Sequence, residues 1–179
     1  MELVRLLECR FVCNHLFDHL VHLVLKIYKN LESLLEHYQI IHLSGRGKMR
    51  SEVSYPGYWQ TEYVSTGLAD LLALSSSVIS RAGANSIFEL RALQKPMVLV
   101  PLVLGSRGDQ VVNAQMFAHN AWAEVLEEKS LSLKKFISSI EKSLTLKAKE
   151  SSTSKQQEDS CLLVLNMLST LVSSKVKYE

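Results

Sequence analysis

Residues 76–90 read Ser76-Ser-Val-Ile-Ser-Arg-Ala-Gly-Ala-Asn-Ser-Ile-Phe-Glu-Leu90. The apolar pair Val78-Ile79 predicts a short buried strand, and the small residues after Arg81 predict a tight turn. Asn85 or Ser86 is a suitable N-cap for a helix that follows the turn. Three apolar residues are expected along the buried face of that helix: Ile87, Leu90 and Leu93. The stretch therefore predicts a strand, a tight turn and a helix N-terminus.

The start of a helix after such a turn is suited to binding an anion. Its first backbone N–H groups have no partner within the helix, and the helix dipole places partial positive charge there. A phosphate is therefore a suitable ligand. Glu89 lies near the first turn, where its carboxylate can accept hydrogen bonds from the two hydroxyls of a ribose. An ordinary strand–helix turn without a ligand is the alternative interpretation.

The composition indicates a cytoplasmic globular protein. The 179 residues suffice for one domain with a core, and 47% of them are hydrophobic. The net charge of +2 and the dispersed basic residues argue against nucleic-acid binding. Cys9, Cys13 and Cys161 lack metal-ligand spacing and indicate reduced thiols. Charges near the N-terminus argue against a signal peptide, and no apolar run reaches the ~20 residues of a membrane span.

Residues 1–38 are expected to form a helical segment with an atypical start. Apolar residues at spacings of three and four support a helix, namely Leu16, Leu20, Leu23, Ile27, Leu31 and Leu34. The first dozen residues fit a strand or a helix equally. His15, His19 and His22 lie near the apolar stripe, so a metal or membrane role is one interpretation. A solvated helix flank is preferred, because the sequence supplies no acidic or cysteine partner.

Predicted strands and helices alternate from residue 39 to residue 146. The strands are expected at 39–43, 61–64, 78–79, 97–102 and 123–126. The helices are expected at 67–74, from 85 or 86 to about 94, at about 109–119, and at 131–146. Val112, Met116 and Phe117 are expected to face inward from the third helix, and Ser130 or Ser132 is expected to cap the fourth. This alternation predicts an α/β fold, a doubly wound, Rossmann-like domain with a mostly parallel sheet. Residues 147–179 are expected to form a linker and a final helix at 162–172.

Three loops at the carboxyl ends of the predicted strands are expected to converge on one crevice, at residues 44–48, 80–86 and 104–110. In the third loop, Asp109 and Gln110 can pair with sugar hydroxyls. Alternatively, Asp109 caps its helix and Gln110 faces solvent. Arg107 can neutralise a phosphate or lie in water. Arg81 can bind a phosphate or be a buried structural arginine, and the structural role is preferred.

Several classes of enzyme are disfavoured by missing motifs. The sequence contains no Gly-x-Ser-x-Gly, no His-Glu-x-x-His and no Walker loop. A chain that transferred hydride by itself should carry Gly-x-Gly-x-x-Gly near its start, but Gly45 is the first glycine. We therefore expect neither a catalytic metal nor a cofactor.

Several ordered motifs are similar to those of a known family. They are Ser80-Arg-Ala-Gly-Ala-Asn-Ser-Ile-Phe-Glu89, Lys95-Pro-Met-Val-Leu-Val-Pro101 and Gly108-Asp-Gln-Val-Val-Asn-Ala114, with His42-Leu-Ser-Gly-Arg-Gly47 and Gln60-Thr-Glu-Tyr-Val64 upstream. Residues 39–130 thus resemble the C-terminal domain of the MurG family, within glycosyltransferase family 28. The resemblance implies the C-terminal half of a GT-B fold. It also implies UDP-GlcNAc as the donor of N-acetylglucosamine to lipid I, which yields lipid II in peptidoglycan synthesis.

The resemblance also implies roles for particular residues. Glu89 corresponds to the glutamate that holds the ribose hydroxyls, and the backbone of Val64 to the group that reads the uracil edge. The helix start at residues 84–86 lies beside the diphosphate and ribose, and Asp109 with Gln110 contacts the donor sugar. The full set of implied donor-binding residues is Val64, Arg81, Gly83, Ala84, Asn85, Ser86, Glu89, Arg107, Asp109, Gln110 and Asn113.

Two family features have no counterpart in the sequence. The acceptor-binding N-terminal domain, which holds the general base proposed for the family, is expected to be absent. The Gly-Gly-Ser-x-Gly-Ala loop that helps to hold the diphosphate corresponds to residues 6–14, where there is no glycine. The resemblance therefore implies a transferase's donor-binding domain that does not turn over alone. The full-length enzyme would act on a lipid-linked acceptor at the inner face of the cell membrane. The alternative is a non-catalytic or degenerate nucleotide-sugar-binding protein that acts through a partner.

Overall fold

The computed structural model describes residues 10–13, 28–103 and 107–146. The chain divides into two compact units, Met1–Lys147 and Ala148–Glu179, and all described residues lie in the first. The predictions for His15, His19 and His22, for the linker after residue 146 and for the helix at 162–172 fall outside the described residues.

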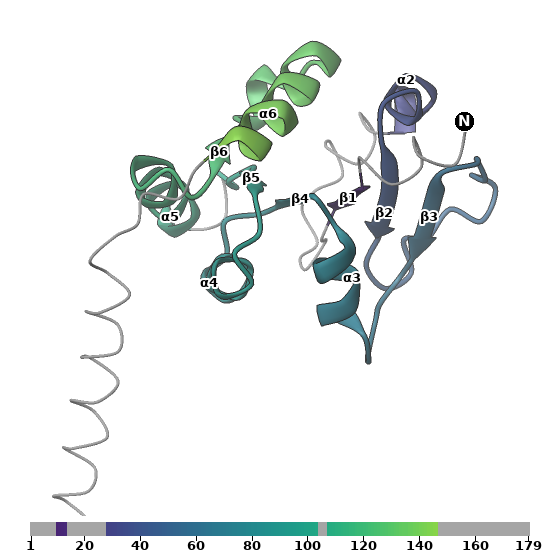
Figure 1. Cartoon of the computed structure of the whole chain (residues 1–179), viewed down its shortest axis with the longest axis horizontal. Coiled ribbons are helices and arrows are strands. Elements are labelled where there is room, and N and C mark those ends of the chain that lie inside the picture. The colour runs from purple at the N-terminus through teal and green to yellow at the C-terminus, as the bar shows by residue number, and fades with distance from the viewer. Residues whose placement is uncertain (1–9, 14–27, 104–106, 147–179) are drawn as a thin grey trace, which may run out of the picture. The chain divides into compact units, whose positions relative to one another are not determined.

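One parallel sheet organises the described part of the chain (Figure 1). Its strands are β1 (Arg10–Cys13), β2 (Gln39–Leu43), β3 (Tyr58–Thr61), β4 (Ser77–Ser80), β5 (Met97–Leu99) and β6 (Glu124–Val125). They lie in the order β3-β2-β1-β4-β5-β6, and every neighbouring pair is parallel. This is the order of a doubly wound Rossmann fold, so the predicted fold class is confirmed.

Helices cover both faces of the sheet (Figure 1). They are α2 (Leu31–Leu35), α3 (Leu68–Leu74), α4 (Ala84–Ala92), α5 (Asp109–His119) and α6 (Leu133–Thr145), with a short 3-10 helix, η2, at Glu128–Ser130. Helices α2 and α6 contribute to one hydrophobic cluster, and α3, α4 and α5 contribute to the other.

The two clusters arise because successive strand residues point to opposite faces of a sheet. In β4, Ile79 packs with the α2–α6 cluster, whereas Val78 packs with the α3–α5 cluster. Both side chains are fully buried. Burial of an aliphatic side chain of this size stabilises the fold by about 1.5–3 kcal/mol. The apolar pair of β4 is therefore buried on both faces of the sheet, and the prediction of a short buried strand at Val78-Ile79 is confirmed.

The ammonium group of Lys95 closes the end of α3. Its Nζ atom donates to the backbone oxygens of Ala73 at 2.7 Å and Ser75 at 3.0 Å. These carbonyls lie at the helix C-terminus, where a cation is favourable. Burial lowers the pKa of Lys95 from its usual value of 10.5.

Within the segment 1–38, for which a helical character was expected but whose first dozen residues were left open, the structure has a strand at β1. Residues 10–13 form a central strand, with Phe11 opposite both Ile40 of β2 and Ser77 of β4. The strand has only three apolar residues, Phe11 to Cys13, after Arg10, and so short a run has no distinctive periodicity that would separate it from part of a helix. The sheet therefore begins before residue 39.

The strand predicted at 61–64 actually lies at Tyr58–Thr61. Its register pairs Tyr58 with Ile40, and His42 Nδ1 lies 2.7 Å from Tyr58 Oη. The sequence-based interpretation ended the turn too late, because it did not count the aromatic residues directly after Gly57 as strand residues. Similarly, β5 ends at Leu99 rather than at residue 102.

The helices occur where they were predicted, but some of their faces differ. In α5, Ala114 and Phe117 are fully buried, whereas Val112 and Met116 are 65% and 41% exposed. Leu93 is 38% exposed because α4 ends at Ala92, before it. At α6, Ser132 accepts from the Lys135 backbone N–H at 3.3 Å, which confirms it as the cap.

Candidate functional site

The strand order creates a switch point between β1 and β4. From β1 the sheet grows toward β2 and β3 on one side, and from β4 toward β5 and β6 on the other. Open α/β sheets bind ligands at such a point, beyond the carboxyl ends of the strands. Strand β4 ends there at Ser80, and the turn Arg81–Gly83 leads directly into α4.

The N-terminus of α4 presents unpaired donors at this switch point. The helix begins at Ala84, and Gly83 is its N-cap, without a side-chain capping bond. The prediction of Asn85 or Ser86 as the cap is therefore wrong, because both lie in the first helical turn. The first bond of the helix runs from Ile87 N to Gly83 O, at 3.1 Å. Within the described residues, the N–H groups of positions 84–86 have no partner, which favours an anion there.

Gly83 leaves open space beside these donors. Its φ of −69° is accessible to any residue, so the turn does not require glycine for its conformation. A Cβ atom added to Gly83 would meet no described atom within 4 Å. A ligand could therefore approach the backbone closely at this position.

Glu89 is an exposed carboxylate on the same helix. It is the sixth residue of α4 and lies in the second turn, one turn further along than expected. No ion pair or hydrogen bond of its side chain occurs within the described chain. Its acceptor oxygens are thus available for a ligand next to the helix start.

Arg81 has structural partners. Its side chain is only 7% exposed, and Nη1 donates to Val100 O at 3.0 Å and to Glu128 Oε2 at 3.1 Å. The guanidinium thereby links the end of β4 to the residues that follow β5 and to η2. This geometry supports the structural alternative over the phosphate-binding one.

The loop before α5 is shaped by two residues in the left-handed region. Arg107 has a φ of 50° and Gly108 a φ of 86°. Gly108 is the N-cap of α5 without a side-chain bond, so Asp109 does not cap the helix as one alternative supposed. Asp109 and Arg107 are both exposed. Gln110 is half-buried, and its Oε1 accepts the Leu102 backbone N–H at 3.0 Å, so it does not simply face solvent.

Asn113 connects α5 to the β4–α4 turn. Its Nδ2 donates to the backbone oxygen of Ala82 at 3.0 Å. This bond joins the second predicted loop to α5, the helix that follows the third.

The loops after β2 and β3 also lie side by side. Ser44 N donates to Thr61 O at 2.8 Å, and Gly45 N donates to Glu62 O at 3.1 Å. These bonds continue the parallel ladder beyond the strands. The backbone of Val64, two residues after Glu62, therefore lies at the carboxyl edge of the sheet, as does the glycine-rich loop at residues 44–48.

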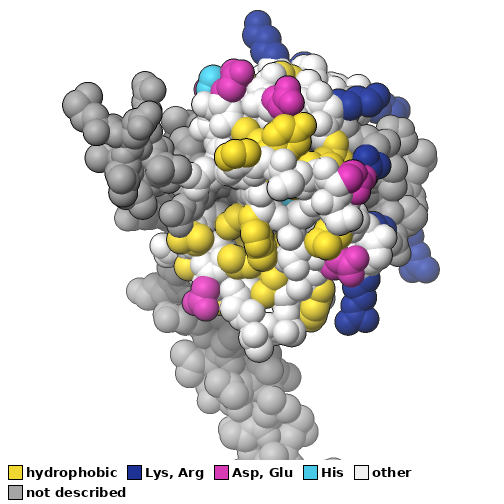
Figure 2. All heavy atoms as spheres, turned by 90° about the vertical axis from the view of Figure 1, so that its right-hand side faces the viewer, with side chains coloured by type: hydrophobic (Ala, Val, Ile, Leu, Met, Phe, Trp, Pro, Cys, Tyr) yellow, Lys and Arg dark blue, Asp and Glu magenta, His cyan; other side chains and the backbone are white. Residues whose placement is uncertain are grey.

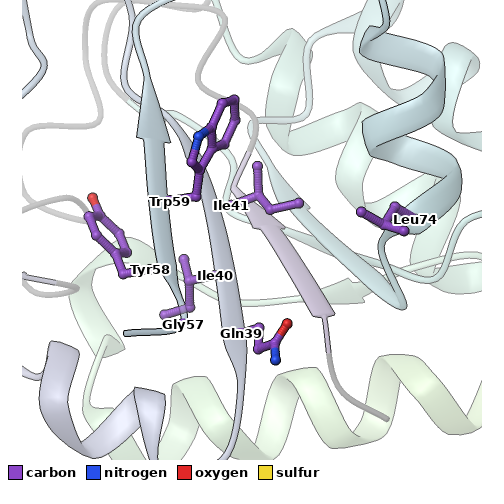
Figure 3. Close-up of a pocket in the computed structure, with 7 residues that line it drawn as sticks. All are labelled: Gln39, Ile40, Ile41, Gly57, Tyr58, Trp59 and Leu74. Carbon is purple, nitrogen blue, oxygen red and sulfur yellow. The ribbon is translucent and has the colours of Figure 1, made fainter. Parts of the chain in front are cut away.

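A hollow of about 210 Å³ lies at the opposite edge of the sheet (Figure 3). It is lined by Gln39, Ile40, Ile41, Gly57, Tyr58, Trp59 and Leu74. Gln39 and Tyr58 are the first residues of their strands, so this hollow is at the amino edge, away from the switch point. Figure 2 shows hydrophobic side chains on the side of the molecule where β3 is the edge strand in Figure 1. Trp59 and Leu74 in the lining are each 48% exposed. The hollow contains none of the predicted site residues.

Two partners in the site were not predicted from the sequence. Glu128 lies 47 positions from Arg81, and Leu102 was assigned to a strand rather than to the loop that Gln110 holds. No local pattern marks either contact. Within the described residues there is no cluster of three metal-ligating side chains and no helix long and apolar enough to span a membrane.

Comparison with known proteins agrees with this geometry. The family model described as "Glycosyltransferase family 28 C-terminal domain" matches residues 12–164, further in both directions than the motifs at 39–130. The chain is 48% identical over 117 residues to the UDP-N-acetylglucosamine--N-acetylmuramyl-(pentapeptide) pyrophosphoryl-undecaprenol N-acetylglucosamine transferase of Staphylococcus carnosus. That match covers 65% of this chain and 32% of the relative. The Staphylococcus aureus protein of the same name is 48% identical over 108 residues, a match that covers 60% of this chain and 30% of that protein.

Solved structures show the same fold at low identity. MurG of Acinetobacter baumannii superimposes with a TM-score of 0.64 at 16% identity, covering 79% of this chain and 45% of that one. The glycosyltransferase of kitacinnamycin gives a TM-score of 0.62 at 16% identity, covering 77% and 35%. The chain spans about a third of the length of the curated relatives it matches. It belongs to glycosyltransferase family 28, as a C-terminal domain with the GT-B type of α/β fold.

Proposed function

We propose that this chain is the donor-binding part of an N-acetylglucosaminyltransferase, with UDP-GlcNAc as its ligand. The observation that carries the proposal is the start of α4 at the switch point, with free backbone donors in its first turn and the exposed carboxylate of Glu89 in its second. The relatives that share 48% identity are named as UDP-N-acetylglucosamine transferases, which supports the same donor.

The arrangement suits each part of this ligand. The diphosphate would lie against the N–H groups of residues 84–86, which compensate its charge. Glu89 would accept hydrogen bonds from the ribose hydroxyls, and the backbone of Val64 would read the uracil edge. Asp109 and Gln110 would contact the sugar, with Arg107 near the phosphates.

The chemistry supplied by these residues is that of donor positioning and leaving-group stabilisation. As the glycosidic bond breaks, negative charge grows on the departing UDP, and preorganised N–H groups lower the energy of that state. We place the acceptor, lipid I, and the base that activates its hydroxyl on another domain. The chain by itself is then expected to bind donor without turnover. The complete enzyme would work at the cytoplasmic face of the membrane.

A non-catalytic nucleotide-sugar-binding protein is the second candidate. One observation favours it: the sequence from β1 to α2 contains no glycine, although a glycine loop there would help to hold a diphosphate. Bulky side chains limit how closely a ligand can approach the backbone. A transfer assay with lipid I and a separately supplied acceptor domain separates the candidates, because only the transferase would form lipid II.

The direct test is a titration of the full chain with UDP-GlcNAc and UDP. Glu89→Ala removes a charged acceptor and is expected to lower affinity by about 1.5–3 kcal/mol, or roughly 10- to 150-fold. Glu141→Ala is the matched control, because Glu141 is also an exposed helical glutamate, on α6. Absence of binding by the wild type, or equal effects of the two variants, would refute the proposal.

A further inference from the structure

The side chain of Asn113 is committed to the backbone of the turn before α4. Its Nδ2 atom donates to Ala82 O at 3.0 Å, across 31 positions of sequence. Asn113 is half-buried, and Ala82 is fully buried. A hydrogen bond in this setting is protected from competition by water, so it holds the carbonyl in one direction.

Fixing the carbonyl of Ala82 also fixes the amide of Gly83. The two groups belong to one planar trans peptide, in which C=O and N–H point in opposite directions. The Gly83 N–H therefore points away from Asn113, and no described group accepts it. Gly83 is the N-cap of α4, so its amide immediately precedes the free N–H groups of residues 84–86.

Gln110 acts in a similar way on the neighbouring loop. Its Oε1 accepts the Leu102 N–H at 3.0 Å, so the first two turns of α5 hold the loops after both β4 and β5. The loop after β4 has the more direct link to the proposed site, because its last residue, Gly83, is followed at once by the first residue of α4.

We propose that Asn113 is a positioning residue for the diphosphate of the ligand: it orients the Ala82–Gly83 peptide, so that the Gly83 N–H and the start of α4 face the anion. This inference rests on the proposed function. A positioning role can be told apart from a direct contact between Asn113 and the donor sugar. Removal of the side chain would weaken binding of the phosphates in the first case and binding of the sugar in the second.

The test measures binding of UDP-GlcNAc, UDP and uridine to the full chain carrying Asn113→Ala. Affinity for UDP and UDP-GlcNAc is expected to fall equally, on the order of fivefold, which is the effect of one hydrogen bond. Uridine, which has no phosphate, should bind as it does to the wild type. Asn113→Leu, which keeps the side-chain volume without the N–H donor, should behave like the alanine variant.

Asn120→Ala is the matched control. Asn120 lies at the other end of α5 and also donates through Nδ2 to a backbone oxygen, that of Met116 at 2.8 Å. Its removal should leave all three affinities unchanged. A ligand-free readout is the backbone amide resonance of Gly83 in an NMR spectrum, which should shift in Asn113→Ala and stay in place in Asn120→Ala.

The other outcomes overturn the inference. Loss confined to UDP-GlcNAc would assign Asn113 to the sugar, and equal losses for all three ligands would indicate a general structural effect. An unmoved Gly83 resonance or unchanged UDP affinity would also refute the positioning role. If the wild type binds none of the ligands, the proposed function fails in the unmodified protein and the positioning role fails with it.

Discussion

Replacement of Arg81 by methionine is expected to destabilise the fold strongly. Methionine fills a similar volume but removes the bonds from Nη1 to Val100 O at 3.0 Å and to Glu128 Oε2 at 3.1 Å. The first bond comes from a buried charged group and contributes about 1.5–3 kcal/mol. The second adds about 1 kcal/mol or less, because the Glu128 side chain is 23% exposed. The expected loss is about 2–4 kcal/mol.

Denaturant unfolding of the full chain measures this loss, and thermal unfolding should show a fall in Tm on the order of 10 °C. Glu128→Gln keeps an acceptor without the charge and should cost less than about 1 kcal/mol. Arg91→Met is the control for loss of an arginine, because the Arg91 guanidinium stacks on Trp122 at 4.4 Å and should contribute at most about 1 kcal/mol. If Arg81→Met folds as stably as the wild type but no longer binds UDP, Arg81 is a phosphate ligand and the structural assignment is refuted.

Two further predictions concern other residues of the domain. Gly83→Ala should change stability by less than about 1 kcal/mol, because the ordinary φ and the open space for a Cβ favour alanine, whereas alanine is a poorer N-cap than glycine. The same Cβ should weaken UDP binding in a titration, whereas wild-type affinity would show that the ligand does not approach there. Lys95→Met should lower the unfolding free energy by about 1 kcal/mol through lost bonds to Ala73 and Ser75. Since burial lowers the pKa of Lys95 from 10.5, the unfolded chain binds the proton more tightly. The unfolding free energy of the wild type minus that of Lys95→Met should therefore rise between neutral pH and about pH 10.5. Denaturant unfolding across that range measures this difference, and a fall in it would contradict the prediction.

The sequence predicted those elements whose signals are local. The apolar pair in β4 and the small residues after it specified a strand, a turn and a helix, and the structure has them at Ser77–Ser80, Arg81–Gly83 and Ala84–Ala92. The alternation of strands and helices was enough for the doubly wound class. Boundaries failed where a short apolar run is ambiguous, as in β1, or where aromatic residues follow a turn directly, as in β3.

The individual roles of site residues depended on contacts between distant positions. Glu89 and the helix start at Ala84 follow from local sequence, because a turn before a helix exposes its first donors wherever the chain lies. Arg81 remained ambiguous until its partner Glu128, 47 positions away, was known. Asn113 was assigned to the ligand, but the structure joins it to Ala82, 31 positions away.

By itself the sequence determined the fold class, the family motifs and the presence of a helix start directly after a tight turn, since these depend on residue periodicity and turn chemistry over short stretches. Only the tertiary structure decided that β1 lies at the centre of the sheet and that α4 begins at the switch point beside it. It alone showed which polar side chains are already engaged by the backbone. The physical reason is that strand order and side-chain pairing are set by packing between elements far apart in the chain, for which no local pattern is specific.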